Sequence, residues 1–227
     1  MLCFYRYSDK GKNPTDYGYS VTKKQCFESF FEEFKDEKII VILDNSSDES
    51  YDYFKTFNLD VTKTSLGNGA SAYFVMEQAI KSFSEKIIYF AEDDYLYKSK
   101  KCAALIKEGL EFSDYCSLYD HGDKYKNFNS QPNPLLENNG ESTVLFRTEN
   151  SHWKYTNSTT MTFATKREIL FEDLSLIKLF CTNPVPLDFR IFLELERLKR
   201  RKIATCVPGR STHLSPDKDN MSPFFYD

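Results

Sequence analysis

The sequence lacks the apolar runs and cysteine patterns that mark several classes of protein. No stretch approaches the roughly 18 apolar residues that a membrane-spanning helix needs. The first residues lack the basic region and long apolar core of a secretory signal. The six cysteines form no CxxC pair and no cysteine–histidine pair, so a zinc site is disfavoured and buried, reduced thiols are expected. We therefore expect a cytoplasmic protein without a transmembrane segment.

An excess of positive charge is absent as well. The 227 residues include 30 Lys and Arg against 34 Asp and Glu, a net charge of -4. This balance gives no general attraction to phosphate backbones, so we expect no nucleic-acid partner. The one basic patch, at 197–202, falls at the end of a predicted helix. Cations there usually face solvent and the helix dipole, and a phosphate or lipid-headgroup surface is the weaker alternative.

Short apolar runs alternate with helical patterns along the chain, which is typical of an α/β domain with a largely parallel sheet. With 41% hydrophobic residues, the chain is long enough for one sizeable core. The expected strands are 2–7, 39–43, 59–64, 86–91, 115–119, 143–146 and 159–164. The expected helices include 49–57, 166–180 and 187–201, a helix that buries Phe27, Phe30, Phe31 and Phe34, and two whose buried stripes span 72–80 and 102–110. Thr22 and Gln25 predict a capping box. The segment 127–140, rich in Asn, Pro and Gly, predicts a loop long enough for a lid.

Acidic residues follow two of the predicted strands. Asp44 follows 39–43, and Glu92, Asp93 and Asp94 follow 86–91. In an open parallel sheet, ligands bind beyond the carboxyl ends of the strands. Three adjacent carboxylates repel one another unless a cation or protonation relieves them, and Mg²⁺ or Mn²⁺ takes oxygen ligands together with substrate phosphates. The alternative is that these acids only solvate a turn and cap the next helix.

Five motifs occur in an order and spacing that resemble glycosyltransferases of the GT-A fold. They are VILDNSSD at 41–48, GNG at 67–69, FAEDDYL at 90–96, LDF at 187–189 and STH at 211–213. The chain is similar to the small family-2-like transferases of bacteria, phages and large DNA viruses. The segment 44–48 departs from the family's DDGSTD-type pattern, because the second acid and the glycine are missing.

The resemblance implies a GT-A (nucleotide-diphospho-sugar transferase) fold, with a Rossmann-like, mostly parallel central sheet flanked by helices. It implies one domain over 1–227, with a nucleotide-binding half of about 1–95 and an acceptor-binding half of about 96–227. The implied activity transfers a sugar from a nucleotide-diphosphate sugar to a hydroxyl of a glycan or glycoprotein. A UDP-sugar is the expected donor. The location would be cytoplasmic, in the host if the source is a virus.

The resemblance also implies roles for single residues in binding the donor. Asp94 would ligate a divalent ion, Mn²⁺ or Mg²⁺, and His213 would close the metal or diphosphate site. Asp93 would lie near the ribose or a metal-bound water, and Glu92 would support the loop. Asp44 keeps the position that meets the nucleobase.

Three further residues would contact the nucleotide. Tyr5 and Arg6 end the first predicted strand, and Asn68 lies in the GNG turn. Arg6 would pair with a phosphate, and a structural salt bridge is the commoner alternative for an arginine.

Asp188 is the candidate catalytic base. Inverting members of the family place a carboxylate at a helix start roughly this far beyond the metal motif, and Asp188 follows Asp94 by 94 positions. It would take the proton from the acceptor hydroxyl. An ordinary first-turn acid, favoured by the helix dipole, is the alternative.

The acceptor site is expected at two clusters, Asp120 with His121 and His152 with Trp153. Sugar rings stack on aromatic faces, and their hydroxyls need polar partners, so the single tryptophan is a candidate platform. The alternative is a core aromatic with turn acids nearby.

Two other functions stay open. A sugar nucleotidyltransferase would bring a glycine-rich, basic loop near the N-terminus, and 8–13 has one Gly and two Lys. A catalytically silent nucleotide- or carbohydrate-binding module would bind ligand without metal dependence.

Overall fold

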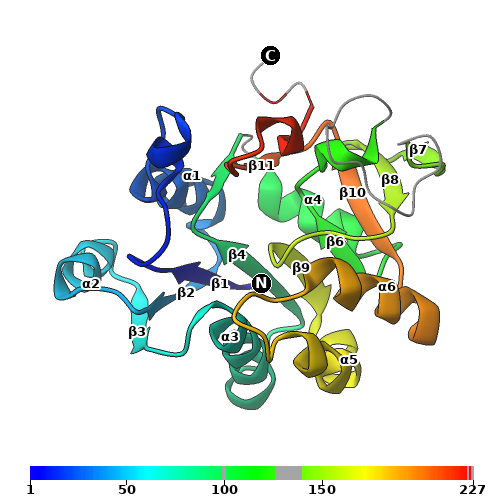
Figure 1. The fold of residues 1–227 in the computed structure, drawn as a ribbon. Helices are drawn as coiled ribbons and strands as arrows, with labels where there is room; N and C mark the ends of the chain where they lie inside the picture. Colours follow the sequence, from blue (N-terminus) through cyan, green and yellow to red (C-terminus); the bar gives the residue numbers. More distant parts are fainter. Residues whose placement is uncertain (99–100, 126–139, 224, 226–227) are drawn as a thin grey trace.

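The computed structural model describes residues 1–98, 101–125, 140–223 and 225. Helices and strands there form one layered α/β arrangement around a nine-stranded sheet (Figure 1). The sheet order is β3-β2-β1-β4-β9-β6-β10-β8-β7. The strands are β1 Leu2–Tyr7, β2 Lys38–Asp44, β3 Asp60–Thr64, β4 Ile87–Glu92, β6 Tyr115–Ser117, β7 Leu145–Arg147, β8 His152–Thr156, β9 Phe163–Lys166 and β10 Ile203–Val207.

The first four strands of the chain are parallel, and the second half of the sheet is mixed. β3, β2, β1 and β4 pair in parallel. β9 is antiparallel to both β4 and β6, β10 is parallel to β6, and β8 is antiparallel to both β10 and β7. Only β9 and β8 therefore oppose the other strands of this sheet, which confirms a mostly parallel sheet.

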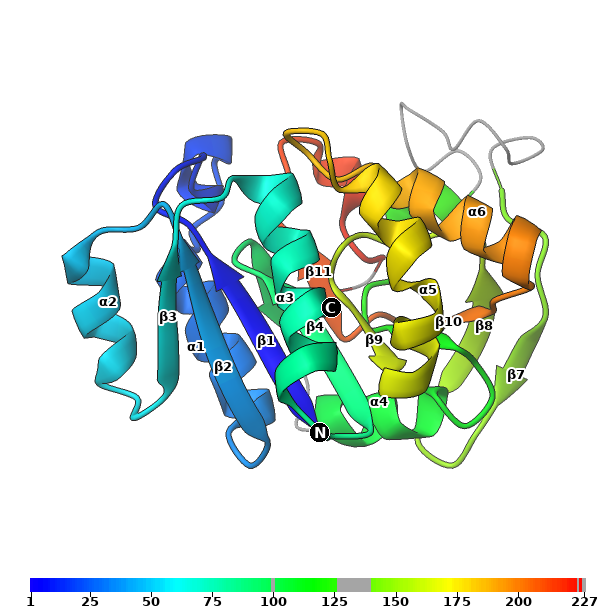
Figure 2. The ribbon, with the colours of Figure 1, turned by 90° about the horizontal axis from the view of Figure 1, so that it is seen from below.

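Six α-helices of the described chain cover the two faces of the sheet (Figure 2). They are α1 Lys23–Phe34, α2 Asp48–Lys55, α3 Asn68–Ser82, α4 Cys102–Gly109, α5 Arg167–Phe180 and α6 Asp188–Lys199. α1, α2 and α4 contribute to one hydrophobic cluster, and α3, α5 and α6 contribute to the other. Along β1 the side chains alternate between them, with Cys3, Tyr5 and Tyr7 in the first and Leu2 and Phe4 in the second.

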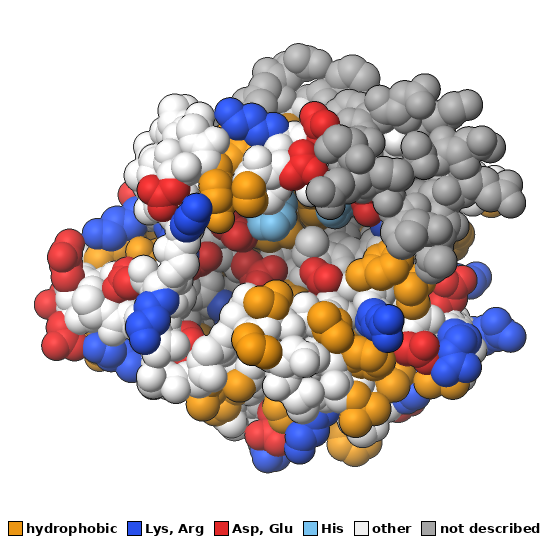
Figure 3. Space-filling view, viewed as in Figure 1, with side chains coloured by type: hydrophobic (Ala, Val, Ile, Leu, Met, Phe, Trp, Pro, Cys, Tyr) orange, Lys and Arg blue, Asp and Glu red, His pale blue; other side chains and the backbone are white. Residues whose placement is uncertain are grey.

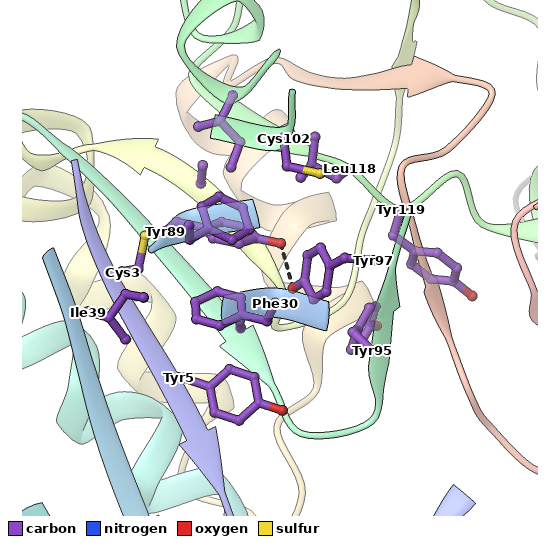
Figure 4. Close-up of a cluster of buried hydrophobic side chains, with 14 of the residues drawn as sticks. Cys3, Tyr5, Phe30, Ile39, Tyr89, Tyr95, Tyr97, Cys102, Leu118 and Tyr119 are labelled. Carbon is purple, nitrogen blue, oxygen red and sulfur yellow. Dashed lines mark hydrogen bonds between the residues drawn. The ribbon is translucent and has the colours of Figure 1, made fainter. Parts of the chain in front are cut away.

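The start of α1 and its buried face follow the sequence pattern. Gln25 N donates to Thr22 Oγ1 at 3.2 Å and Thr22 N to Gln25 Oε1 at 2.9 Å, so the predicted capping box is confirmed. Phe30 packs between Tyr5 and Tyr89, as Figure 4 shows. This aromatic packing on the sheet holds α1, and with it the first turn of α1, in place beside the end of β1.

The structure corrects the sequence prediction in the second half of the chain. Residues 203–207, which were not among the expected strands, form β10, a strand inside the sheet between β6 and β8. β8 was not predicted, and 159–162 precede the strand that was expected to include them. β5 (Tyr95–Tyr97) and β11 (Ser211–His213) form a separate two-stranded antiparallel sheet. The expected loop at 127–140 lies, except for residue 140, outside the described residues.

Several negative expectations can be compared with the structure. All six cysteines are buried and none forms a disulfide, as predicted. None of the helices in the described ranges has the length and apolarity that crossing a bilayer requires. In the basic patch at 197–202, Lys199 and Arg201 both pair with the buried Asp173. Much of the positive charge of this patch is therefore neutralised by ion pairs within the protein.

Candidate active site

A cavity of about 530 Å³ opens at the carboxyl ends of β1, β2 and β4. Acidic side chains and histidine gather in a hollow near the middle of the face shown in Figure 3. The cavity volume is within the usual range for a small-molecule site. The lining residues are Arg6, Tyr7, Ser8, Lys10, Gly11, Lys12, Tyr17, Lys23, Asp44, Asn45, Gly67, Asn68, Ser71, Glu92, Asp93, Asp94, His213, Ser215 and Pro216.

Glu92 is paired with an arginine from the neighbouring strand. Arg6 lies opposite Glu92 in the β1–β4 register, and its Nη2 is 2.6 Å from Glu92 Oε1. Its Nη1 donates to Asn68 O, Asn68 Oδ1 and Ser71 Oγ at 2.9–3.1 Å. Burial raises the pKa of Glu92 to about 7, although Arg6 opposes this shift. Arg6 thus joins the carboxylate to the first turn of α3.

Asp93 is paired with a lysine at the start of α1. Lys23 Nζ lies 3.0 Å from Asp93 Oδ2, and the same oxygen accepts a hydrogen bond from Ser8 N at 2.8 Å. Burial raises the pKa of Asp93, while Lys23 lowers it. The lysine was not a sequence candidate, and its place as the first residue of a predicted helix gave no signal of this contact.

Asp94 is paired with the late histidine. His213 Nε2 lies 3.1 Å from Asp94 Oδ2, and the imidazole stacks on Tyr95 with centroids 4.9 Å apart. Burial raises the pKa of Asp94, but His213 brings it below its ordinary value; Asp94 in turn raises the pKa of His213 against the effect of burial. The other oxygen, Asp94 Oδ1, is buried and has no hydrogen-bond partner. It is the group in this triplet that a bound cation would satisfy.

The three adjacent acids are therefore compensated one by one. The fold supplies a partner for each acid from three separate segments: Arg6 for Glu92, Lys23 for Asp93 and His213 for Asp94. Each carboxylate of the triplet therefore has its own side-chain partner within the fold.

Asp44 holds a loop together. It is 5% exposed, and its two oxygens accept from Leu66 N, Gly67 N, Thr64 Oγ1 and Asn45 Nδ2 at 2.7–2.9 Å. A carboxylate has about four acceptor positions, and here they are used within the protein. A nucleobase contact through Asp44 would have to displace one of these bonds.

Asp188 begins α6, as predicted. Its charge raises the pKa of Glu92, so the two carboxylates lie near one another. Burial raises the pKa of Asp188 itself, and His121, His213 and Lys124 act in the opposite direction. Asp188 therefore lies within electrostatic reach of Glu92, His121 and His213, although it is not among the residues that line the cavity. A partly buried carboxylate with a raised pKa is suited to accept a proton near neutral pH.

Three sequence candidates belong to the protein interior. Tyr5 is fully buried, with its ring 5.1 Å from that of Phe27, and it is not among the residues that line the cavity. Trp153 is also fully buried, and its Nε1 donates to Thr148 Oγ1 at 2.8 Å, so it offers no face to a sugar. Asp120 is 1% exposed and pairs with Lys154 at 2.9 Å.

His152 is exposed but stands apart from the acid triplet. It begins β8, which is the fourth strand from β4 in the sheet, about 19 Å away at the usual strand spacing. His121 is the one acceptor candidate that the structure places near Asp188.

Two groups of cavity residues were not among the predicted site residues. Lys10 and Lys12 line the cavity from the loop at 8–13, which follows β1. Ser215 and Pro216 line it from the segment after β11. The basic character of 8–13 was visible in the sequence, whereas the position of 215–216 depends on the pairing of β11 with β5.

No family model matches the sequence, and no curated protein matches it. Several solved structures are similar to the chain. A nucleotidyl transferase from Methanothermobacter, Mth528, is 12% identical with a TM-score of 0.52, covering 91% of this chain and 88% of its own. A putative nucleotide-diphospho-sugar transferase from Desulfovibrio desulfuricans G20 is 8% identical with a TM-score of 0.51, covering 90% and 78%. S. aureus TarS 1-349 is 16% identical with a TM-score of 0.50; the match covers 90% of this chain and 58% of TarS 1-349.

These similarities show the fold. The chain has the α/β fold of the nucleotide-diphospho-sugar transferases, with helices on both faces of a large, mostly parallel sheet, which confirms the predicted fold class. The chain spans less than two thirds of TarS 1-349.

Proposed function

We propose that the protein is a glycosyltransferase that moves a sugar from a nucleotide-diphosphate sugar, a UDP-sugar, to a hydroxyl of a glycan or glycoprotein. The observation that carries this proposal is the Asp94–His213 pair at the end of β4. It lies in a cavity that also presents Arg6, Lys10 and Lys12, and it leaves Asp94 Oδ1 buried without a partner. Oxygen and imidazole ligands beside cationic groups suit a metal-bound diphosphate.

The available protein ligands suit a divalent ion whose remaining coordination positions the substrate phosphates and water would fill. Among the described residues, no group of three or more His, Cys, Asp and Glu side chains could hold an ion alone. Mg²⁺ is usually bound by one or two carboxylates together with substrate phosphates and water. Asp94, through its unpartnered Oδ1, and the neighbouring His213 would hold such an ion. Mn²⁺ or Mg²⁺ at these residues would stabilise negative charge on the leaving diphosphate.

The chain's own residues perform the remaining tasks. Lys10 and Lys12 offer positive charge to the phosphates, and Arg6 orients Asn68 at the cavity wall. Asp188 takes the proton of the acceptor hydroxyl as that oxygen attacks the anomeric carbon, on the side opposite the diphosphate. Inversion of the anomeric centre follows from this single displacement.

The test is donor turnover. The protein is incubated with Mn²⁺ and a panel of UDP-sugars, with and without a pool of glycan acceptors, and released UDP is measured. The proposal expects UDP release from one donor class, its loss in Asp94→Asn, and acceptor-dependent release that Asp188→Asn abolishes. Release that is equal in wild type and Asp94→Asn would contradict it.

A nucleotidyltransferase is the second candidate, because the loop at 8–13 lies at the cavity. Lys10, Gly11 and Lys12 line it, as a pyrophosphate-binding loop would. The similarity to the nucleotidyl transferase Mth528 also covers 88% of that chain. Pyrophosphate release from UTP and a sugar 1-phosphate, without UDP release from any UDP-sugar, would favour this alternative. Nucleotide binding without either product would favour the silent binding module.

A further inference from the structure

Lys23 connects three segments beneath the cavity. Its side chain is 8% exposed, and its Nζ lies 2.9 Å from Ser8 O and 3.0 Å from Asp93 Oδ2. Because Ser8 N also donates to Asp93 Oδ2, the three residues form a closed ring of polar contacts. The ring joins the end of β1, the start of α1 and the acid triplet.

The same lysine anchors both ends of the loop at 8–13. At one end its Nζ donates to Ser8 O, and at the other its backbone N donates to Asn13 Oδ1 at 3.3 Å. Gly11, near the middle of the loop, has φ +98°, and a Cβ built there would lie 3.9 Å from Lys23 Nζ. The loop therefore folds over the ammonium group, with Lys10 and Lys12 directed to the cavity.

A buried lysine is costly unless its charge is paired and hydrogen-bonded. The contacts of Lys23 with Asp93 and Ser8 offset part of the free-energy cost of its burial. Because Lys23 also lines the cavity, its positive charge acts on any ligand there. Asp93 has no other cationic partner within salt-bridge distance among the described residues. Without the lysine, a bare carboxylate would face the cavity and repel phosphate.

We propose that Lys23 is a positioning residue for nucleotide binding. It holds Asp93 and the loop at 8–13 in the arrangement that receives the phosphates, and it supplies beside Asp93 the positive charge that a metal ion would otherwise have to supply. The inference rests on the proposed function, in that the cavity must bind a nucleotide. It adds that part of this binding is independent of metal and depends on a residue outside the metal site.

The test is calorimetric titration of UDP into wild type and Lys23→Met, each with EDTA and with saturating Mn²⁺. In EDTA the variant is expected to bind UDP about 10- to 100-fold more weakly, the effect of losing a hydrogen-bonded charge. With Mn²⁺ the loss is smaller, because the ion offsets the charge of Asp93. The ratio of the two affinities is the decisive readout, since partial unfolding would lower the binding stoichiometry in both conditions alike.

Two variants control for charge and for folding. Lys24→Met removes the next lysine of α1, which is 39% exposed and pairs with Glu49 at 3.7 Å, and is expected to leave both affinities unchanged. Lys23→Arg keeps the charge and is expected to restore most of the metal-free binding. If Lys23→Met does not fold, Asp93→Asn tests the same ring. It is expected to narrow the difference between the UDP affinities with and without Mn²⁺, because it removes the negative charge that Lys23 and the ion would offset, and an unchanged difference would contradict the inference.

The outcomes separate the inference from the proposed function. Absence of UDP binding by wild type in both conditions would overturn the nucleotide site itself. Wild-type binding that Lys23→Met retains in EDTA would overturn only the role of Lys23. In the double variant Lys23→Met/Asp93→Asn, the loss is expected to be no larger than that of the weaker-binding single variant. Additive losses would contradict a lysine that acts through Asp93.

Discussion

His213 and Asp94 are 119 positions apart in the chain, yet their side chains meet at 3.1 Å. The two-stranded sheet of β5 and β11 brings them together, since His213 lies opposite Tyr95 in its register. Leu214 N also donates to Asp94 O at 2.9 Å, which fixes the backbone beside the pair. The late segment of the chain therefore completes the site that the end of β4 begins.

His213→Gln is expected to weaken Mn²⁺ binding in the presence of UDP about tenfold or more, by analogy with the loss of a residue that supports a metal site. The reason is the loss of one of the two proposed ligands. Mn²⁺ titration followed by water-proton relaxation measures this affinity. His152→Gln is the matched control, because His152 is exposed on β8 and outside the cavity. Equal Mn²⁺ affinity in both variants would exclude His213 as a ligand.

Arg6→Met is expected to lower the free energy of unfolding by about 1–3 kcal/mol, because it leaves a partly buried carboxylate without its hydrogen-bond partner. The variant leaves Glu92 without its cation and releases Asn68 and Ser71 of α3. Urea unfolding measures the change. Arg6→Met/Glu92→Gln should regain most of the lost stability, and a single variant as stable as wild type would show that the pair is not stabilising.

Transfer activity is expected to fall as the pH is lowered, with an apparent pKa above the ordinary range of an aspartate. Asp188 must be ionised to take a proton, and burial raises its pKa, so protonation removes activity at a higher pH than for an exposed aspartate. His121→Gln should move this limb to still higher pH, because His121 lowers the pKa of Asp188. The pH profile of kcat/KM at saturating Mn²⁺ tests both shifts. Asp188→Asn should reduce transfer about 100- to 10,000-fold and leave UDP binding intact.

Gly69→Ala is expected to destabilise the protein by about 1–3 kcal/mol, the usual cost of overpacking. A Cβ there would lie 2.1 Å from Asn183 O and 2.7 Å from Cys181 O, which are backbone atoms of the segment leading to Asp188. Thermal unfolding measures the stability, and the rate of transfer reports the displaced base. Gly67→Ala meets no atom within 4 Å and should cost only the strain of φ +87°. A Gly69→Ala variant with wild-type stability and rate would show that the segment adapts freely.

The sequence predicted the parallel half of the fold well, because local patterns determine it. Each of β1, β2 and β4 is a short apolar run that ends at a polar residue or a turn, and the helices between them have clear buried stripes. This alternation also placed Asp44 and the acid triplet at one edge of the sheet. The rule that ligands bind there needs only the order of strands and helices.

The antiparallel half was predicted less well, since its strands depend on distant partners. β10 follows a basic run and precedes a proline-containing tail, and it is a strand because β6 and β8 pair with both of its edges. β11 has three residues and exists through β5. Neither has a local pattern that separates it from a loop.

The partners of the ion pairs could not be predicted from the sequence for the same reason. The sequence positions made candidates of Arg6, Glu92, Asp94 and His213. No sequence pattern indicated which lysine forms the ion pair with Asp93. Burial was the other gap, because Tyr5 and Trp153 carry the same side chains whether they face a ligand or the core. Alternation along β1 explains the outcome there, with Arg6 directed to the cavity wall and Tyr5 to the opposite cluster.

The most direct test of the central claim is calorimetric titration of UDP, with and without Mn²⁺, into wild type and Asp94→Ala. A metal-bound diphosphate at Asp94 predicts that Mn²⁺ strengthens UDP binding by wild type and that this gain disappears in Asp94→Ala, while a circular dichroism spectrum shows the variant folded. A gain from Mn²⁺ that persists unchanged in folded Asp94→Ala, or no UDP binding by wild type in either condition, would contradict the account.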